Sequence, residues 1–153
     1  MTMNSLFIII PGEPVAKGRP RIGTNRHTGR AIAFTPARTV RAEATIAHFA
    51  AQAMAGRDLL TGPLMVIITA YRSKGMPGSA TAKEGTKART CYDAAEAGTL
   101  KPITKPDADN YLKTVCDALN GVVYHDDAQI TDITIRKRYS SQPRLEIHIQ
   151  EQG

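Results

Sequence analysis

One short stretch constrains the fold of this chain more than any other, because it requires acids that are distant in sequence to meet. It reads Lys-Pro-Asp-Ala-Asp-Asn-Tyr-Leu-Lys over residues 105–113, and Asp127 follows seventeen residues after Asn110. Two carboxylates about 4 Å apart repel by roughly 4 kcal/mol at an effective dielectric constant of about 20. An exposed Asp–Lys pair four residues apart on a helix returns only about 0.3 to 0.5 kcal/mol. Lys113 alone therefore cannot hold such acids together, whereas a hard divalent cation such as Mg²⁺ can.

The acids lie at the start of a predicted helix over residues 107–119, which Asn120-Gly121 ends. Four apolar residues recur at i, i+3, i+4 and i+7 and form its stripe: Leu112, Val115, Cys116 and Leu119. On the helical wheel Asp109, Lys113 and Asp117 form the neighbouring row, at the rim of the core. Asp117 lies about 12 Å from Asp109 along the helix axis, so we interpret it as structural.

Each acid taken alone also has an ordinary structural explanation. An Asp at a helix entrance, as expected of Asp107, is a cap rather than a ligand by about four to one. Asp126-Asp127 alone is typical of a polar turn, and Lys113 alone of a solvated side chain. Asn110 either orients a ligand or caps the helix.

The other elements predict an α+β fold. Apolar runs over residues 6–10 and 64–71 predict two strands covered on both faces, and we expect these strands to be neighbours. Thr35-Pro36 predicts the start of a long helix that reaches about Gly56. Its apolar positions repeat at helical spacing and are Val40, Ala44, Ala47 and Ala51. Residues 86–97 predict a shorter helix.

Two alternating strands end the chain. Ile133 and Ile135 share one face of the first strand, and residues 140–144 are predicted to be the hairpin loop between the two strands. The second strand has three apolar residues on one face: Leu145, Ile147 and Ile149. With no linker or repeat to divide it, the chain is predicted to be a single domain over residues 1–153. We expect a small mixed sheet of about four to five strands with two main helices packed on it.

Composition excludes several classes of protein. The chain has 153 residues and 42% hydrophobic content, which suits a globular domain. No apolar run approaches the ~20 residues of a membrane span, and residues 6–10 are too short for a signal peptide, so a soluble cytoplasmic protein is expected. Cys91 and Cys116 have neither metal-ligand nor disulfide spacing and are predicted to be reduced thiols.

Basic residues cluster near the N-terminus. The net charge is +6, and residues 17–30 contain no acid. Glycines and prolines separate the cations there, which favours a loop over a helix. The five cations are Lys17, Arg19, Arg21, Arg26 and Arg30. A solvated loop is one interpretation, and a phosphate-binding loop, with a salt slope near −4.5 for about five phosphates, is the other. Arg136 and Arg138 either extend this surface or face solvent.

Taken together, these patterns closely resemble the RusA family of Holliday junction resolvases, DNA endonucleases often carried by phages and prophages. The resemblance rests on residues 105–113, on Asp-Ala-Leu-Asn-Gly-Val-Val-Tyr from Asp117, and on Asp-Asp-Ala-Gln-Ile from Asp126. Residues 14–21, with Thr35-Pro36 after them, are similar to the family's basic N-terminal signature. The match covers most of the chain apart from about residues 72–100.

The resemblance implies a site and a substrate. Asp107, Asp109 and Asp127 are expected to bind catalytic Mg²⁺, for which Mn²⁺ is a possible substitute, and Lys113 is expected to be essential. Beside these ligands, Asp126 is either a partner that supports them, which we favour slightly, or a solvated neighbour, and Asn110 is the other candidate for a supporting role. The residues expected to bind DNA are Lys17, Arg19, Arg21, Arg26, Arg30 and Lys105. A four-way junction has two-fold symmetry, so a homodimer is expected as its partner.

Three hypotheses follow. The leading one is a Mg²⁺-dependent, structure-selective endonuclease that resolves four-way junctions in recombination, repair or phage DNA processing. A cation held by carboxylates would activate water and stabilise charge on the phosphate. The second is a non-catalytic DNA-binding module whose acids are caps and salt-bridge partners. The third is a hydrolase of free nucleotides, for which the long basic segment would be superfluous.

Overall fold

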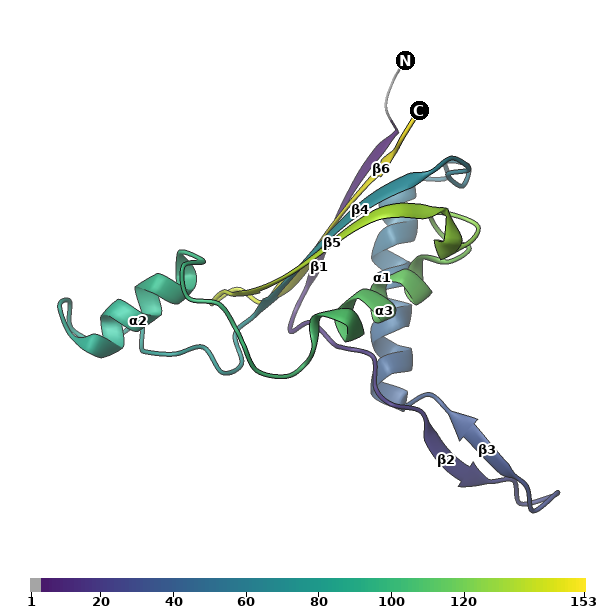
Figure 1. Ribbon diagram of the computed structural model, residues 1–153, viewed down its shortest axis with the longest axis horizontal. Coiled ribbons are helices and arrows are strands. Elements are labelled where there is room, and N and C mark those ends of the chain that lie inside the picture. Colours follow the sequence, from purple (N-terminus) through teal and green to yellow (C-terminus); the bar gives the residue numbers. More distant parts are fainter. Residues whose placement is uncertain (1–3) are drawn as a thin grey trace.

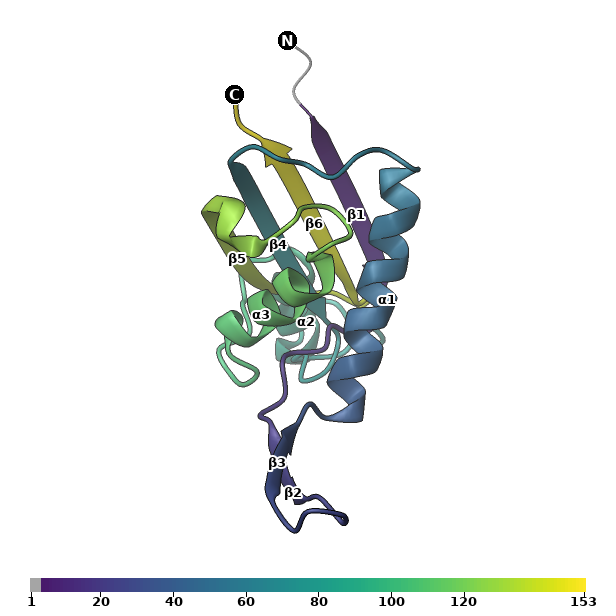
Figure 2. The same cartoon turned by 90° about the vertical axis from the view of Figure 1, so that its right-hand side faces the viewer.

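A computed structural model describes residues 4–153 and has a four-stranded mixed sheet at its centre (Figure 1). The strands in sheet order are β1 (Ser5–Pro11), β6 (Arg144–Glu151), β4 (Leu64–Arg72) and β5 (Ile130–Tyr139). β6 is antiparallel to both of its neighbours, whereas β4 and β5 are parallel. Helices α1 (Ala37–Met54) and α3 (Ala108–Leu119) cover one face of the sheet (Figure 2). The predicted α+β class with two main helices on a small mixed sheet is confirmed.

The predicted strand neighbours were wrong in two places. β6 lies between β1 and β4, so the two strands that were predicted to be neighbours are not adjacent. Residues 140–144 do not close a hairpin, because β4 lies between β5 and β6. Parallel strands such as β4 and β5 need a long crossover connection. Residues 73–129 provide it, and the acid-bearing helix α3 is part of that crossover.

The core lies between the sheet and the two helices. β1 alternates, with Leu6, Ile8 and Ile10 buried, whereas Phe7 is 56% exposed and Ile9 is 46% exposed. The expectation that this strand is covered on both faces was therefore wrong, since the helices cover one face only. Central strand β4 is buried over most of its length, as expected of a strand with partners on both edges.

Helix α1 has the predicted extent but a different buried stripe. It begins after Pro36 and ends at Met54, and its C-cap residue Ala55 has a left-handed φ of 49°. Its buried residues are Thr39, Ile46, Ala50 and Met54. Val40, the first of the apolar positions that repeat at helical spacing, is 51% exposed. Alanines on every side of this helix give the sequence too little contrast to mark the buried face.

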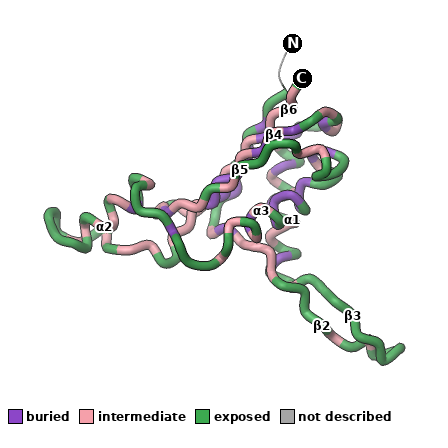
Figure 3. Tube along the Cα trace, in the orientation of Figure 1, coloured by how far each residue is buried: buried purple, intermediate pink, exposed green. Residues whose placement is uncertain are grey.

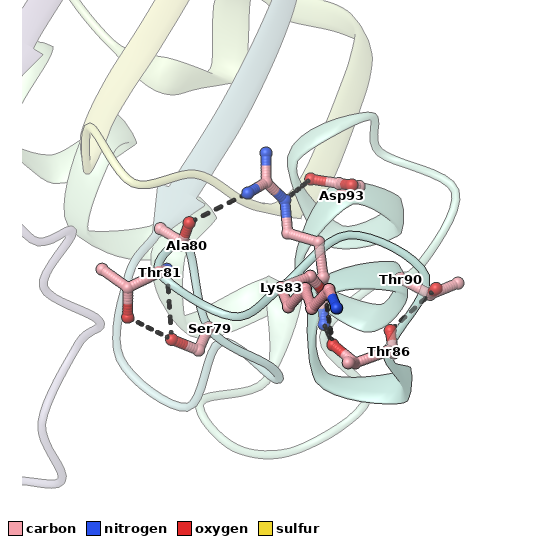
Figure 4. Close-up of polar contacts among 8 residues, drawn as sticks. Ser79, Ala80, Thr81, Lys83, Thr86, Thr90 and Asp93 are labelled. Carbon is pink, nitrogen blue, oxygen red and sulfur yellow. Dashed lines mark hydrogen bonds and ion pairs between the residues drawn. The ribbon is translucent and has the colours of Figure 1, made fainter.

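The crossover includes a lobe that lies beyond the end of the sheet and contains α2 (Lys87–Glu96), which confirms the shorter predicted helix (Figure 1). The Thr86 hydroxyl caps α2 by accepting from the Arg89 N–H. The Arg89 guanidinium donates to Asp93, at 3.0 Å, and to the carbonyl of Ala80, at 3.1 Å (Figure 4). These short-range contacts fold the lobe largely on itself.

The basic segment forms a hairpin that stands apart from the main sheet. Strands β2 (Arg21–Thr24) and β3 (Ala31–Phe34) pair only with each other and project from the base of α1 (Figure 1). The prediction that this segment is not a helix is confirmed, although it contains strands where only a loop was expected. Nearly all of its residues are exposed (Figure 3). We call residues 19–35 the basic arm.

Within residues 4–153, no helix combines the length and apolar character needed to cross a membrane.

Candidate active site

The first acids of the predicted site lie at the start of α3. Asp107 is the N-cap residue in extended conformation, and its side chain makes no capping hydrogen bond. Asp109 lies in the first turn, where the helix dipole favours a negative charge. The Lys113 ammonium donates to Asp109 Oδ2 at 3.2 Å, and both side chains are more than half exposed. The predicted pairing along this row of α3 is therefore present, at the surface rather than at a half-buried edge.

Two cations fix the segment that leads into α3. Lys137 Nζ donates to the carbonyls of Thr104, at 2.8 Å, and Pro106, at 2.9 Å. Arg72 Nη1 donates to the carbonyl of Lys105 at 2.8 Å. Strands β4 and β5 thus bind three consecutive carbonyls just before the helix. Hydrogen bonds from charged donors stabilise by about 1.5 to 3 kcal/mol each, so the segment is held firmly.

Neither of these two residues was predicted from the sequence, although one signal for Lys137 was available. Lys137 continues the alternating row of Ile133 and Ile135 along β5, so its side chain starts on the face that the helices cover. A cation on such a row needs a buried or half-buried acceptor. Arg72 had no comparable signal, because its partner lies 33 residues away in the crossover.

A glutamate fixes the two residues that follow Arg72. Glu13 Oε1 accepts from the backbone N–H groups of Ser73, at 2.8 Å, and Lys74, at 2.9 Å, and from the Ser73 hydroxyl. Arg72 Nε donates to the Lys74 carbonyl at 2.9 Å. The segment after β1, the end of β4 and the entrance of α3 are thus one connected network.

Asp127 begins the short 3₁₀ helix η1 (Asp127–Gln129) after β-bridge residue Tyr124. Asp126 caps η1, because its Oδ1 accepts from the Ala128 N–H at 3.0 Å. The Gln129 side chain completes the capping box by accepting from the Asp126 N–H at 3.2 Å. The side chain predicted to support a ligand therefore has a local role in shaping this turn.

Asp126 and Asp127 share a hydrogen bond that shifts their pKa values in opposite directions. The bond to Asp126 raises the pKa of Asp127, and burial and the charges of Asp126 and Asp117 act in the same direction. The Ala128 N–H, followed by the bond to Asp127, lowers the pKa of Asp126. Of the two acids, Asp127 therefore has the higher pKa. Crowded carboxylates of this kind are the ones that a divalent cation stabilises.

The structure does not bring the three predicted metal ligands together as one group. Asp107 and Asp109 lie at the N-terminal end of α3. The acid of α3 whose charge raises the pKa of Asp127 is Asp117, two turns further along the helix. Across residues 4–153, no three His, Cys, Asp or Glu side chains are gathered closely enough to hold a metal ion. The donors have the right chemistry for a hard cation, since all are carboxylate oxygens, but not the arrangement.

Lys17, predicted to bind DNA, has intramolecular partners. Its ammonium lies 2.6 Å from Glu43 on α1 and 2.9 Å from Asp117 on α3, and its side chain is 24% exposed. Burial acts to lower its pKa, but the hydrogen bonds to the two carboxylates outweigh burial and raise it. Its backbone N–H also donates to the Asn110 carbonyl at 2.9 Å. Lys17 thus fastens the root of the basic arm to both helices, and a contact of its side chain with DNA stays a prediction.

The remaining predicted DNA-binding side chains are exposed. They are Arg19, Arg21, Arg26, Arg30 and Lys105. Asn110 lies on the first turn of α3 and uses its carbonyl oxygen to accept from Lys17 and, at 3.1 Å, from the Thr114 hydroxyl. The structure therefore brings the root of the basic arm beside the acidic end of α3.

The chain is similar to known proteins over most of its length. The family model of the endodeoxyribonuclease RusA matches residues 11–150. An uncharacterized protein of Bacillus subtilis (strain 168), YqaN, is 39% identical over 149 residues. This similarity covers 97% of the present chain and 98% of the Bacillus protein. The matched region includes the basic arm, α3 and η1.

Proposed function

The chain belongs to the RusA family of endodeoxyribonucleases, and from this premise we propose that it is a structure-selective nuclease that resolves four-way DNA junctions. The observation that carries the proposal is the attachment of the basic arm to the acid-bearing helix. The Lys17 N–H donates to the carbonyl of Asn110, one residue after Asp109. A surface that binds phosphates is thereby adjacent to carboxylates and a lysine suited to phosphodiester hydrolysis.

Each group has a proposed role. The arginines of the basic arm, with Lys105, neutralise phosphates on either side of the scissile bond. Lys113 stabilises the negative charge that develops on the phosphate. Arg72 and Lys137 keep the entrance of α3 in place through the carbonyls that they bind.

Asp107, Asp109 and Asp127 are the proposed ligands of Mg²⁺, with Mn²⁺ as a possible substitute. Support comes from their exposure and from the preference of both ions for oxygen donors. A bound divalent cation supplies charge neutralisation and a more acidic water. The three carboxylates do not form one group as they stand, so a site that uses all three requires at least one of these side chains to move.

We also propose that the active form is a homodimer, because two symmetric cuts in a two-fold symmetric junction require two related sites. Sedimentation of the free protein and of its junction complex measures this directly. Recombination, repair and phage DNA processing are the proposed settings, since each produces branched DNA.

The central test uses Asp107→Asn and Asp127→Asn. Both variants are expected to bind a labelled four-way junction as the parent does, because binding depends on the cationic surface. Cleavage in Mg²⁺ is expected to fall at least about 100-fold, since each variant removes a charged ligand. Gel electrophoresis of junction and linear duplex, with Mg²⁺ or EDTA, measures both quantities.

The matched control is Asp58→Asn, an exposed acid in the connection between α1 and β4, which is expected to leave cleavage unchanged. Undiminished cutting by either site variant would contradict the assignment of the acids. Loss of junction binding by both would assign them to the DNA-binding surface instead.

A specific observation favours one alternative, a non-catalytic DNA-binding module. Asp126 caps η1, Asp109 pairs with Lys113, and Asp117 pairs with Lys17, so these acids have structural partners. This alternative predicts junction binding with no cleavage product in Mg²⁺ or Mn²⁺. The same gel therefore separates the two functions.

A further inference from the structure

Large apolar side chains on the basic arm are exposed. Ile22 is 80% exposed, Phe34 is 48% exposed and Ile32 is 47% exposed. They occupy both faces of the hairpin, because Ile22 pairs across the strands with Ala33, and Ile32 pairs with Gly23. The arm projects away from the sheet and both helices that cover it (Figures 1 and 3).

The charge around these side chains indicates which kind of partner binds to them. No acid lies between Glu13 and Glu43, and the arm contains four arginines: Arg19, Arg21, Arg26 and Arg30. A surface that is apolar and strongly cationic suits a polyanion with accessible apolar faces. DNA bases have such faces, but a continuous duplex covers them by stacking. A branch point interrupts that stacking and exposes them.

We propose that Ile22, Ile32 and Phe34 contact the exposed base faces at the branch point, so that the arm distinguishes a junction from linear duplex. The inference rests on the proposed DNA substrate but not on cleavage. Proteins that bend DNA insert apolar side chains between base steps and spend a few kcal/mol per step on unstacking. That cost is smallest where the bases are already unstacked, which makes the contact selective for branches.

The geometry of the arm suits this role. Residue 23 is glycine, and a Cβ there would lie only 3.2 Å from the Phe34 ring, so the ring lies across the opposite strand. An isolated two-stranded hairpin is marginally stable in water. Contact with bases would therefore add stability to the element that makes it. The hairpin is also narrow enough to enter a groove or an open branch point.

The test is the double variant Ile22→Thr/Ile32→Thr, which removes apolar surface but keeps β-branched side chains and every arginine. Binding is measured in EDTA, to prevent cutting, on a four-way junction and on a linear duplex of equal length. Junction affinity is expected to fall on the order of tenfold while duplex affinity is unchanged.

A second assay measures the fluorescence of a 2-aminopurine base at the branch point, which is expected to increase with the parent protein but not with the variant. The same base placed in the middle of an arm of the junction is expected to change with neither protein.

Ile9→Thr is the matched control, because Ile9 is also an exposed strand isoleucine, on the open face of the main sheet. It is expected to behave as the parent in both assays. A double variant that keeps the parent's junction preference and fluorescence change would overturn the inference. So would a shift from dimer to monomer in the double variant, since that assigns the arm to contact between copies. A parent protein that binds junctions selectively but never cuts them would overturn the nuclease proposal alone.

Discussion

Lys17 is a cation of the basic segment whose charge is paired within the protein. Two carboxylates within 3 Å hold its ammonium, and one of them, Asp117, lies a hundred residues away in sequence. Neither Glu43 nor Asp117 is fully exposed, so solvent screens the three charges only in part. Lys17 therefore connects the basic arm to both helices rather than extending its free charge.

We expect Lys17→Met to lower the free energy of unfolding by about 1 kcal/mol at neutral pH, because it leaves two acids without their cation. The pKa of Lys17 is raised in the folded state, so its stabilisation is fully present below the usual value of 10.5 and is lost as the pH rises through the raised value. Urea unfolding at several pH values measures the difference between parent and variant.

The difference should stay constant from pH about 7 to 9 and shrink above pH about 10.5. Arg26→Met, at the exposed tip of the arm, serves as the control and should not alter stability. A Lys17→Met protein as stable as the parent would mean that the ion pairs contribute nothing.

Residues with local partners were predictable, and residues with distant partners were not. The pairing of Asp109 with Lys113 and the capping position of Asp107 follow from helix periodicity and from the residues beside them. The partners of Lys17 and Arg72 depend on which elements meet in space. No pattern within a few residues encodes that information.

At the scale of elements, sequence periodicity identified the helices and the four strands of the main sheet, but it missed β2 and β3 and did not show which strands are neighbours. Alternation tells which side of a strand is buried, and it is the same whether the adjacent strand is β4 or β6. The antiparallel insertion of β6 between β1 and β4 is therefore invisible until the last strand is placed. The entrance of α3 depends on this order, because β4 and β5 supply the cations that hold it.

We expect Lys137→Met to loosen residues 104–107 while leaving DNA affinity unchanged. Loss of two charge-assisted hydrogen bonds should speed amide hydrogen exchange in this segment at least about tenfold. Cleavage of a junction should slow, because Asp107 follows directly after the loosened carbonyls. Hydrogen-exchange mass spectrometry and the binding gel measure these effects.

Arg136→Met is the matched control for that experiment, because Arg136 is the preceding cation on β5 and lies on the opposite face of the sheet. It should leave exchange in residues 104–107 as in the parent. Equal effects of the two variants would show that loss of charge on β5, rather than the bonds to the carbonyls, is responsible.

At the scale of the whole molecule, the salt dependence of DNA binding is expected to depend on where the cations lie rather than on the net charge of +6. Five cations in the basic segment led to an expected salt slope near −4.5 from the sequence. In the structure Lys17 is neutralised internally, which leaves four exposed arginines on the arm. If each binds one phosphate, the arm should contribute about −3.6 to the slope of log K against log salt concentration, and Lys105 about −0.9 more.

Two substitutions test this assignment of charge. Arg26→Met should make the slope shallower by about 0.9, whereas Lys17→Met should leave it unchanged. Fluorescence anisotropy over a series of salt concentrations in EDTA provides the slopes. An equal reduction in both variants would show that Lys17 leaves its carboxylates to bind DNA.

Strands β1 and β6, the first and last of the chain, are neighbours in the sheet, so the two ends of the described chain lie close together. The Glu151 N–H donates to the Asn4 carbonyl at 2.9 Å, at the end of the sheet farthest from the arm and the α2 lobe (Figure 1). Residues 4 and 153 are therefore near enough for a short peptide to join them. If new ends were opened within the lobe, the chain would be circularly permuted, and the joining peptide would make β6 and β1 the two strands of one β-hairpin.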